Sequence, residues 1–128
     1  MRRAVTCKGT RAPSAPVVRG YEDMIPHLML YAMRDTPAAR SATSALFSGI
    51  ERYDESHGTD LMGMLRVYLQ ENANVSATAA RLYMHRNTLT YRLKKVEELA
   101  PIDLSSADGR FKAMMGLYLL DLGNHREA

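Results

Sequence analysis

The stretch of residues 74–99, NVSATAARLYMHRNTLTYRLKKVEEL, decides the fold, because it holds two helical patterns separated by a short connection. In the second pattern Leu89, Leu93 and Val96 recur at the i, i+4 and i+7 positions that share one face of an α-helix. Burying each of these aliphatic side chains is worth roughly 1.5–3 kcal/mol. The spacing therefore predicts a helix over residues 86–99 that buries this face and exposes the opposite one.

The preceding segment predicts a shorter helix that supports the second one. Asn74 or Ser76 can accept a backbone N–H as its N-cap, and Ala79 is small enough to let two helices cross closely. Only about three residues, 83–85, connect the two helices. A connection this short forces a sharp crossing angle, which is the geometry of a helix-turn-helix.

The positive charge of the chain is concentrated in this unit. The whole sequence has 17 Lys and Arg against 14 Asp and Glu, which gives a formal net charge of +3. Residues 72–96 carry +5 and contain no Asp or Glu, so the rest of the chain sums to −2. A basic surface confined to one segment is typical of nucleic-acid binding.

These features predict that the helix over residues 86–99 enters the major groove of double-stranded DNA. Its outer face is rich in hydrogen-bond donors and cations, which suit base edges and phosphates. Arg86 could instead pair with the neighbouring helix, because it lies about 60° from the buried face. The expected base or groove contacts are Asn87, Thr88, Thr90 and Tyr91, with His85 and Arg86 in the first turn, and the expected phosphate contacts are Ser76, Thr78, Arg81, Lys94 and Lys95.

The same stretch resembles the C-terminal helix-turn-helix of the PucR family of bacterial transcription regulators, which includes the sugar-diacid regulators, and more distantly the Fis-type helix-turn-helix. The family pattern is approximately N-x-S-x-T-A-x-x-L-x-x-H-R-N-T-[LV]-x-Y-R-L-x-[KR]-[IV]-E-E-L, and residues 74–99 match it throughout. Ala100 and Pro101 depart from the Gly turn that usually follows in the family. The resemblance implies sequence-specific DNA binding by the C-terminal end of a bacterial regulator, whose usual upstream sensory region has no room in this chain.

The rest of the sequence predicts an all-α fold, a compact bundle of about six helices that forms one DNA-binding domain over residues 20–128. Pro26 is tolerated in the first of these helices only near its first turn. Thr36 followed by Pro37 is typical of a helix start. Together with the helix-turn-helix, the expected helices cover residues 21–34, 37–53, 60–72 and about 106–122.

Polar and glycine residues predict the ends of these helices. DESHG, residues 54–58, breaks the second helix, and Thr59 can cap the third. Ser105 or Ser106 can cap the last helix, and Gly123 is placed to end it.

The last helix is apolar around most of its circumference, which indicates either a central place in the core or a second partner. Its apolar side chains are Phe111, Met114, Met115, Leu117, Tyr118, Leu119, Leu120 and Leu122. A bacterial helix-turn-helix usually reads two half-sites as a two-fold dimer. We therefore expect a homodimer through residues 111–122.

Residues 1–19 carry five basic residues, no acid and no sustained periodicity, so we expect a disordered basic arm. Cys7 is the sole cysteine and the four histidines are scattered, so no disulfide or metal site is expected. No run of about 18 apolar residues is present, which favours a cytoplasmic protein.

No Gly-rich phosphate loop or nucleophile motif occurs in the sequence, so neither an enzyme nor a cofactor is expected. The alternative to DNA binding is a helical protein-interaction module that keeps the helix-turn-helix fold and recruits a partner through its last helix. Strong, salt-dependent DNA affinity would discriminate against that alternative.

Overall fold

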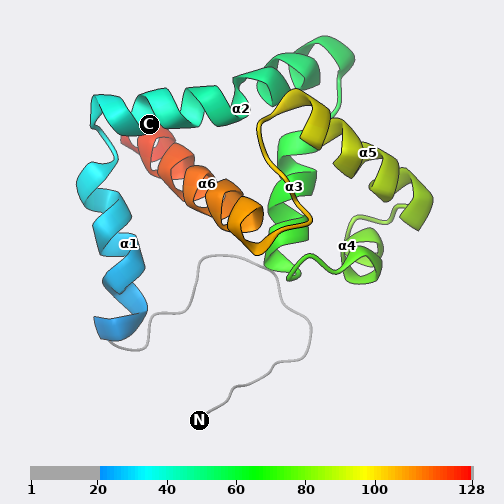
Figure 1. Ribbon diagram of the computed structural model, residues 1–128, viewed down its shortest axis with the longest axis horizontal. Coiled ribbons are helices and arrows are strands. Elements are labelled where there is room, and N and C mark those ends of the chain that lie inside the picture. Colours follow the sequence, from blue (N-terminus) through cyan, green and yellow to red (C-terminus); the bar gives the residue numbers. More distant parts are fainter. Residues whose placement is uncertain (1–20, 128) are drawn as a thin grey trace.

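The computed structural model describes residues 21–127, and within them it confirms the expected all-α bundle of six helices (Figure 1). The expected arm over residues 1–19, with Cys7, lies outside the described residues. No helix over residues 21–127 is long and apolar enough to cross a bilayer. The helices are α1 Tyr21–Met33, α2 Pro37–His57, α3 Leu61–Gln70, α4 Val75–Arg81, α5 Arg86–Leu99 and α6 Ala107–Glu127.

Helix α3 lies at the centre of the molecule and contacts α2, α4, α5 and α6 (Figure 1). Its Leu61 and Leu65 are fully enclosed, and Phe47 and Ile50 from α2 meet them in the main hydrophobic core. The aliphatic face of α5 completes this core. The helix-turn-helix is therefore one side of a shared core rather than a separate unit.

The junction between α2 and α3 differs from the expected one in two ways. The pattern break expected at Asp54 is wrong, because α2 continues to His57 and ends at Gly58, whose φ of 64° suits glycine. The expected cap Thr59 is also wrong, since the Asp60 side chain accepts the Gly63 N–H at 3.0 Å.

The Asp54 carboxylate stabilises the junction between α2 and α3. It accepts hydrogen bonds from the Thr59 hydroxyl at 2.7 Å and from the backbone N–H groups of Leu61 at 2.7 Å and Met62 at 3.1 Å. These N–H groups belong to the first turn of α3, where no intrahelical acceptor is available. A side chain of α2 thus satisfies the start of α3.

Helices α2 and α5 cross closely at Gly49. A Cβ atom at this position would lie 2.5 Å from the carbonyl oxygen of Leu99, the last residue of α5. Only glycine permits that approach without displacing the α5 backbone. The C-terminal end of α5 is therefore held against the middle of α2.

Helix α6 packs against α1, α2 and α3, so its apolar circumference is largely explained by a central place in the bundle (Figure 1). Leu119 forms a small second core with Leu30 of α1 and Ala39 of α2. The His27 ring of α1 meets the Tyr118 ring edge-on, with centroids 5.0 Å apart. Helix α1 thus covers one side of α6.

The first and the last helix of the bundle differ from what the sequence predicts. Pro26 is the sixth residue of α1 rather than part of its first turn, so α1 continues on both sides of a missing backbone donor. Gly123 does not end α6, which runs to Glu127. A single glycine weakens a helix by only about 1 kcal/mol and does not by itself terminate it. The caps expected at Thr36 and Ser106 are confirmed, at 3.1 and 2.9 Å from their backbone donors.

Candidate nucleic-acid interface

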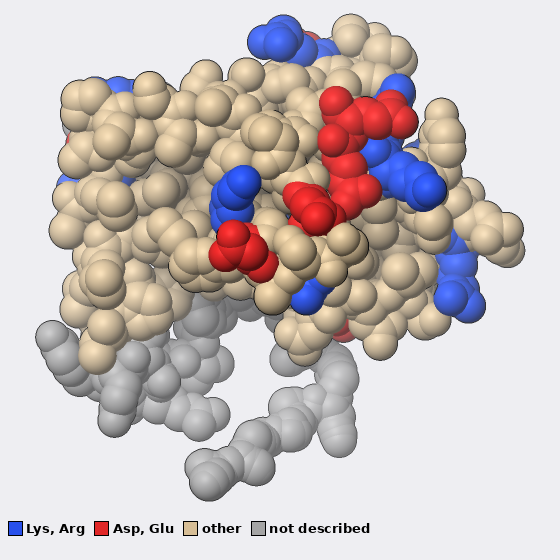
Figure 2. All heavy atoms as spheres, viewed as in Figure 1, with Lys and Arg blue, Asp and Glu red and all other residues tan. Residues whose placement is uncertain are grey.

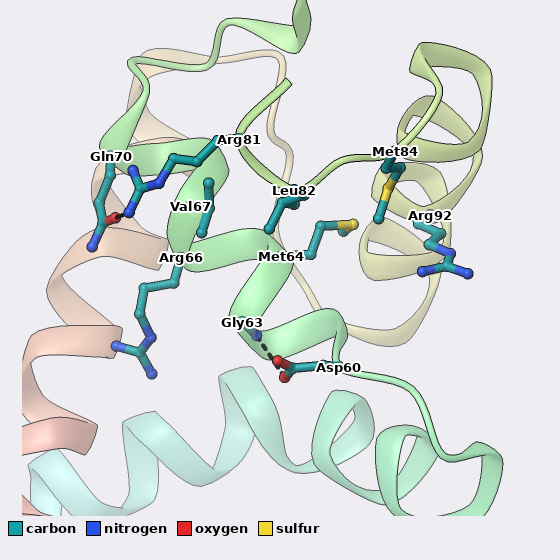
Figure 3. Close-up of a pocket in the computed structure, with 10 residues that line it drawn as sticks. All are labelled: Asp60, Gly63, Met64, Arg66, Val67, Gln70, Arg81, Leu82, Met84 and Arg92. Atoms are coloured by element: carbon teal, nitrogen blue, oxygen red, sulfur yellow. Dashed lines mark hydrogen bonds between the residues drawn. The ribbon is translucent and has the colours of Figure 1, made fainter. Parts of the chain in front are cut away.

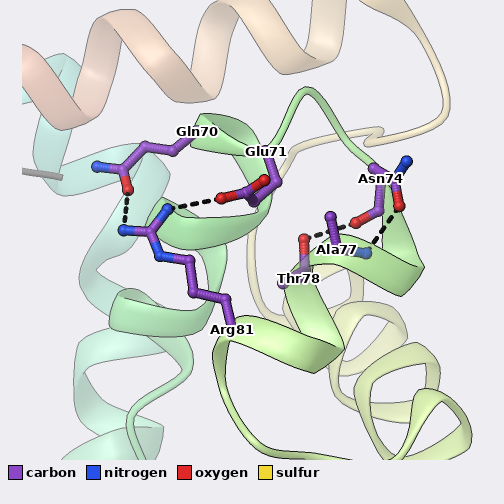
Figure 4. Close-up of polar contacts among 6 residues, drawn as sticks. All are labelled: Gln70, Glu71, Asn74, Ala77, Thr78 and Arg81. Carbon is purple, nitrogen blue, oxygen red and sulfur yellow. Dashed lines mark hydrogen bonds and ion pairs between the residues drawn. The ribbon is translucent and has the colours of Figure 1, made fainter. Parts of the chain in front are cut away.

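The first helix of the helix-turn-helix, α4, is fixed at its start by Asn74 (Figure 4). The Asn74 side-chain oxygen accepts the Ala77 N–H at 2.8 Å, which selects Asn74 over Ser76 as the N-cap. Ser76 is exposed in the first turn. Thr78 does not fit the phosphate contact expected for it, because the residue is 0% exposed and its hydroxyl donates to the Asn74 carbonyl oxygen at 2.7 Å.

Arg81, another expected phosphate contact, is engaged within the protein. Its guanidinium donates to the Glu71 carboxylate at 2.9 Å and to the Gln70 side-chain oxygen at 2.8 Å (Figure 4). Arg81 therefore ties the end of α4 to the end of α3. These contacts leave no helical periodicity in the sequence, because the partners lie ten and eleven residues away on another helix.

The turn after α4 is a compact helix-terminating motif. The Tyr83 N–H donates to the Ala80 carbonyl at 3.3 Å, and the Met84 N–H donates to the Ala79 carbonyl at 2.9 Å. These two bonds, with a φ of 55° at Tyr83, make a Schellman motif. Met84 then packs against the main core, which turns the chain sharply into α5.

His85 is the N-cap of α5, and its Nδ1 accepts the Asn87 N–H at 3.0 Å. The expected buried face is confirmed, with Leu89 and Val96 at 0% exposure and Leu93 at 8%. The outer face is open to solvent from the first turn onwards. Its exposed residues are His85, Arg86, Asn87, Thr88, Thr90, Tyr91 and Lys94.

The charges on α5 are not all equally available. Among residues 21–127, Arg86 and Lys94 make no salt bridge. Lys95 bonds the Glu98 carboxylate at 3.3 Å and lies 5.3 Å from the centre of the Tyr53 ring. The Glu98 hydrogen bond raises the pKa of the Lys95 ammonium above its ordinary value. The i,i+3 spacing of Lys95 and Glu98 was a signal for this pair that the sequence reading did not use.

Arg92 lies away from the outer face of α5. It lines a hollow of about 610 Å³ between α3, α4 and α5, next to Met64 and Met84 (Figure 3). Arg66, on the other side of this hollow, pairs with Asp121 of α6 at 2.6 Å. Arg66 and Arg81 therefore join helices, Arg92 lines the hollow, and Arg86 and Lys94 face solvent.

Figure 2 shows where the charges gather on one face of the molecule. Basic side chains project at the end formed by α4 and α5, beside a group of acidic side chains on the same half of this face, whereas the surface over α1 is mostly uncharged (Figure 2). No group of three or more potential metal ligands occurs within the described part of the chain.

A short helix, a tight turn and a second helix with an exposed polar face define a helix-turn-helix domain. Residues 61–119 match the family model of the PucR C-terminal helix-turn-helix domain. The family resemblance carried by residues 74–99 is confirmed by this match to the PucR C-terminal helix-turn-helix domain. The match also includes α3 and most of α6, which flank the unit in the fold.

Curated relatives support the same family. The chain is 37% identical over 67 residues to the proline-responsive transcriptional activator PutR of Bacillus subtilis, a match that covers 52% of this chain and 16% of PutR. It is 32% identical over 72 residues to the DNA-binding transcriptional activator AdeR of B. subtilis, covering 56% of this chain and 17% of AdeR. The carbohydrate diacid regulator of Escherichia coli is 38% identical over 64 residues, covering 47% of this chain and 17% of the regulator.

The matched segment thus spans about one sixth of the length of these relatives. No solved structure matches the chain significantly. The named relatives are transcription regulators, so the matched helix-turn-helix domain belongs to a non-enzymatic class, as the sequence predicted, and DNA binding is implied.

Proposed function

We propose that this protein binds double-stranded DNA sequence-specifically, with α5 in the major groove, as the C-terminal DNA-reading domain of a bacterial transcription regulator. The outer face of α5 carries this proposal, because its amides, hydroxyls and cations are exposed while its inner face is locked into the core. A helix held in this way projects a fixed set of donors towards a groove. Binding to chromosomal DNA would place the protein in the bacterial cytoplasm.

The exposed residues divide by chemistry. Asn87 is suited to bidentate readout of adenine, and Thr88, Thr90 and Tyr91 offer hydroxyl and apolar contacts to bases. The remaining outer residues, His85, Arg86, Lys94, Lys95 and Ser76, are assigned to phosphates and to the groove edge. Thr78 and Arg81 are left out of this set, since their polar groups serve the fold.

We further propose that the protein reads DNA as a homodimer. One recognition helix spans too few base pairs for high selectivity, so helix-turn-helix proteins pair two half-sites. Although α1 covers part of α6, Phe111, Met114 and Tyr118 stay 61%, 37% and 38% exposed. These residues are spaced at i, i+3 and i+7, so they form one apolar stripe available to a second copy.

Fluorescence anisotropy with a labelled mixed-sequence duplex between about 50 and 200 mM salt tests DNA binding. With roughly three to five phosphates neutralised per subunit, log affinity should fall against log salt with a slope of about −3 to −4.5. Lys94→Gln should flatten the slope by about 0.9. Lys112→Gln is the matched control, because it removes the same charge from an exposed lysine that lies on α6.

The two lysine variants distinguish a phosphate contact made by Lys94 on α5 from a general effect of the protein's net charge. A flattened slope for Lys94→Gln alone supports the proposed face of α5. Equal slopes for both variants would refute that placement. If the wild-type protein does not bind DNA at all, the protein-interaction alternative replaces the proposal, and the apolar stripe on α6 becomes the surface to test.

A further inference from the structure

Tyr83 is the most exposed large apolar residue of the described chain, at 97% exposure. It lies in the turn of the helix-turn-helix, between Leu82 and Met84, which both pack against the main core. The Tyr83 side chain therefore contributes almost nothing to packing. Packing therefore does not explain why this exposed position carries a tyrosine.

The backbone makes this residue choice more unusual. Tyr83 occupies the C′ position of the Schellman motif with a φ of 55°, where glycine is the usual residue because a Cβ atom is strained there. The two hydrogen bonds of the motif use only backbone atoms of residues 79, 80, 83 and 84. Glycine could form the same turn with less strain, so the fold alone does not favour tyrosine.

The location of Tyr83 indicates what its side chain meets. It lies two residues before His85, the N-cap of α5, and therefore borders the first turn of the proposed recognition helix. The segment of residues 72–96 contains no carboxylate that would repel a nucleic acid. A tyrosine hydroxyl is one of the neutral donors that proteins use to bind DNA phosphates.

We propose that Tyr83 is an additional DNA contact, whose phenolic hydroxyl donates a hydrogen bond to a backbone phosphate at the edge of the major groove entered by α5. This inference rests on the proposed DNA-binding function. Because the donor is neutral and the acceptor is the backbone, the contact strengthens binding to all sequences alike. It releases no counterion, so it leaves the salt slope unchanged.

Tyr83→Gly separates this role from a structural one, because it should move stability and DNA affinity in opposite directions. Relief of the positive φ should raise the thermal midpoint by about 2–5 °C. DNA affinity should fall about three- to tenfold, as expected for one lost hydrogen bond. Circular dichroism measures the midpoint, and fluorescence anisotropy on the mixed-sequence duplex measures the affinity.

Tyr83→Phe tests the hydroxyl itself, since the ring and the backbone strain remain. Its affinity should fall about as much as that of Tyr83→Gly, with the thermal midpoint and the salt slope unchanged. Tyr31→Phe is the matched control, because Tyr31 is also exposed, at 52%, but lies on α1 at the other end of the molecule (Figure 1). It should bind DNA as the wild type does.

Each other outcome overturns the inference. Wild-type affinity in Tyr83→Gly, while the wild-type protein binds DNA with a steep salt slope, would refute the Tyr83 contact and leave the proposed function standing. Wild-type affinity in Tyr83→Phe alone would refute hydroxyl donation. Absence of DNA binding by the wild-type protein would refute the proposed function and this contact together.

Discussion

At one end of the molecule, the outer face of α5 exposes amides, hydroxyls and two cations that make no salt bridge within residues 21–127; away from this face, α1 and α6 expose methionine, leucine, tyrosine and phenylalanine side chains. Residues 72–96 contain no Asp or Glu, and residues 24–33 contain no charged residue of either sign. Both ends rest on helices whose inner faces are buried in the bundle. The fold thus separates a surface suited to a polyanion from a surface suited to an apolar partner.

This separation has a physical reason. An apolar contact is weakened when charges must be desolvated with it, and a cationic face binds phosphates best when it stays hydrated and free of carboxylates. On α1, Ile25, Leu28 and Met29 are 41%, 42% and 66% exposed, whereas Leu30 is buried. A two-fold contact between such uncharged surfaces meets no like-charge repulsion.

The largest expected effect is on stability, from a substitution in the main hydrophobic core. Leu89→Ala removes a fully buried side chain of α5 and should lower the free energy of unfolding by about 2–5 kcal/mol. Met29→Ala, at a residue 66% exposed on α1, should change it by less than about 0.5 kcal/mol. Urea unfolding followed by circular dichroism measures both. Similar losses for the two variants would mean that the α1 surface is covered in the folded protein.

The apolar end is tested next, with Phe111→Glu. A buried carboxylate at a dimer contact is strongly unfavourable, so this variant should sediment as a monomer under conditions where the wild type sediments as the proposed dimer. Its affinity for DNA with two half-sites should fall about a hundredfold, because the second half-site no longer binds intramolecularly. Phe111→Leu is the control and should remain dimeric. A wild-type monomer at high micromolar concentration with intact DNA binding would exclude this interface.

The polar end is expected to show a smaller but more selective effect. Asn87→Ala should reduce affinity for the preferred site by about 1–3 kcal/mol and affinity for random DNA much less. The N-cap is preserved in this variant, because His85 accepts the backbone N–H of residue 87 rather than its side chain. Anisotropy with both duplexes measures the difference. Equal losses on the two DNAs would assign Asn87 to the backbone contacts.

The smallest expected effect concerns Lys95. Glu98→Gln removes its carboxylate partner and should tighten DNA binding about two- to threefold at 50 mM salt, with little change at high salt. The pKa of Lys95 should fall back towards its ordinary value of 10.5 in an NMR titration. Because that pKa is raised in the folded state, the stabilisation by the pair is present at neutral pH and is lost only as the pH rises through it. Unchanged DNA affinity would place Lys95 outside the interface.

The sequence alone predicted the parts of the fold that depend on local chemistry. The stripe of Leu89, Leu93 and Val96 follows from helical periodicity, and the Thr36–Pro37 start follows from capping preferences. The family pattern over residues 74–99 identified the unit as a whole. These features need no knowledge of distant residues.

The errors arose where a long-range contact decides the outcome. Asp54 belongs to a stretch that reads as a break, yet its carboxylate satisfies the start of α3 and lets α2 continue to His57. Arg81 carries a group suited to phosphates, and only the tertiary structure shows that Glu71 at the end of α3 already bonds it. Thr78 differs, because its hydroxyl is bonded within α4 to the Asn74 carbonyl oxygen four residues earlier. A helical wheel cannot reveal a partner on another helix.

The contact between Gly49 and Leu99 has a mechanical consequence. Helix α2 is roughly 31 Å long at about 1.5 Å per residue, and its glycine seat for the end of α5 lies past its midpoint. Helix α2 thus joins the second core, where its Ala39 is buried with Leu30 and Leu119, to the C-terminal end of α5, the helix proposed to enter DNA.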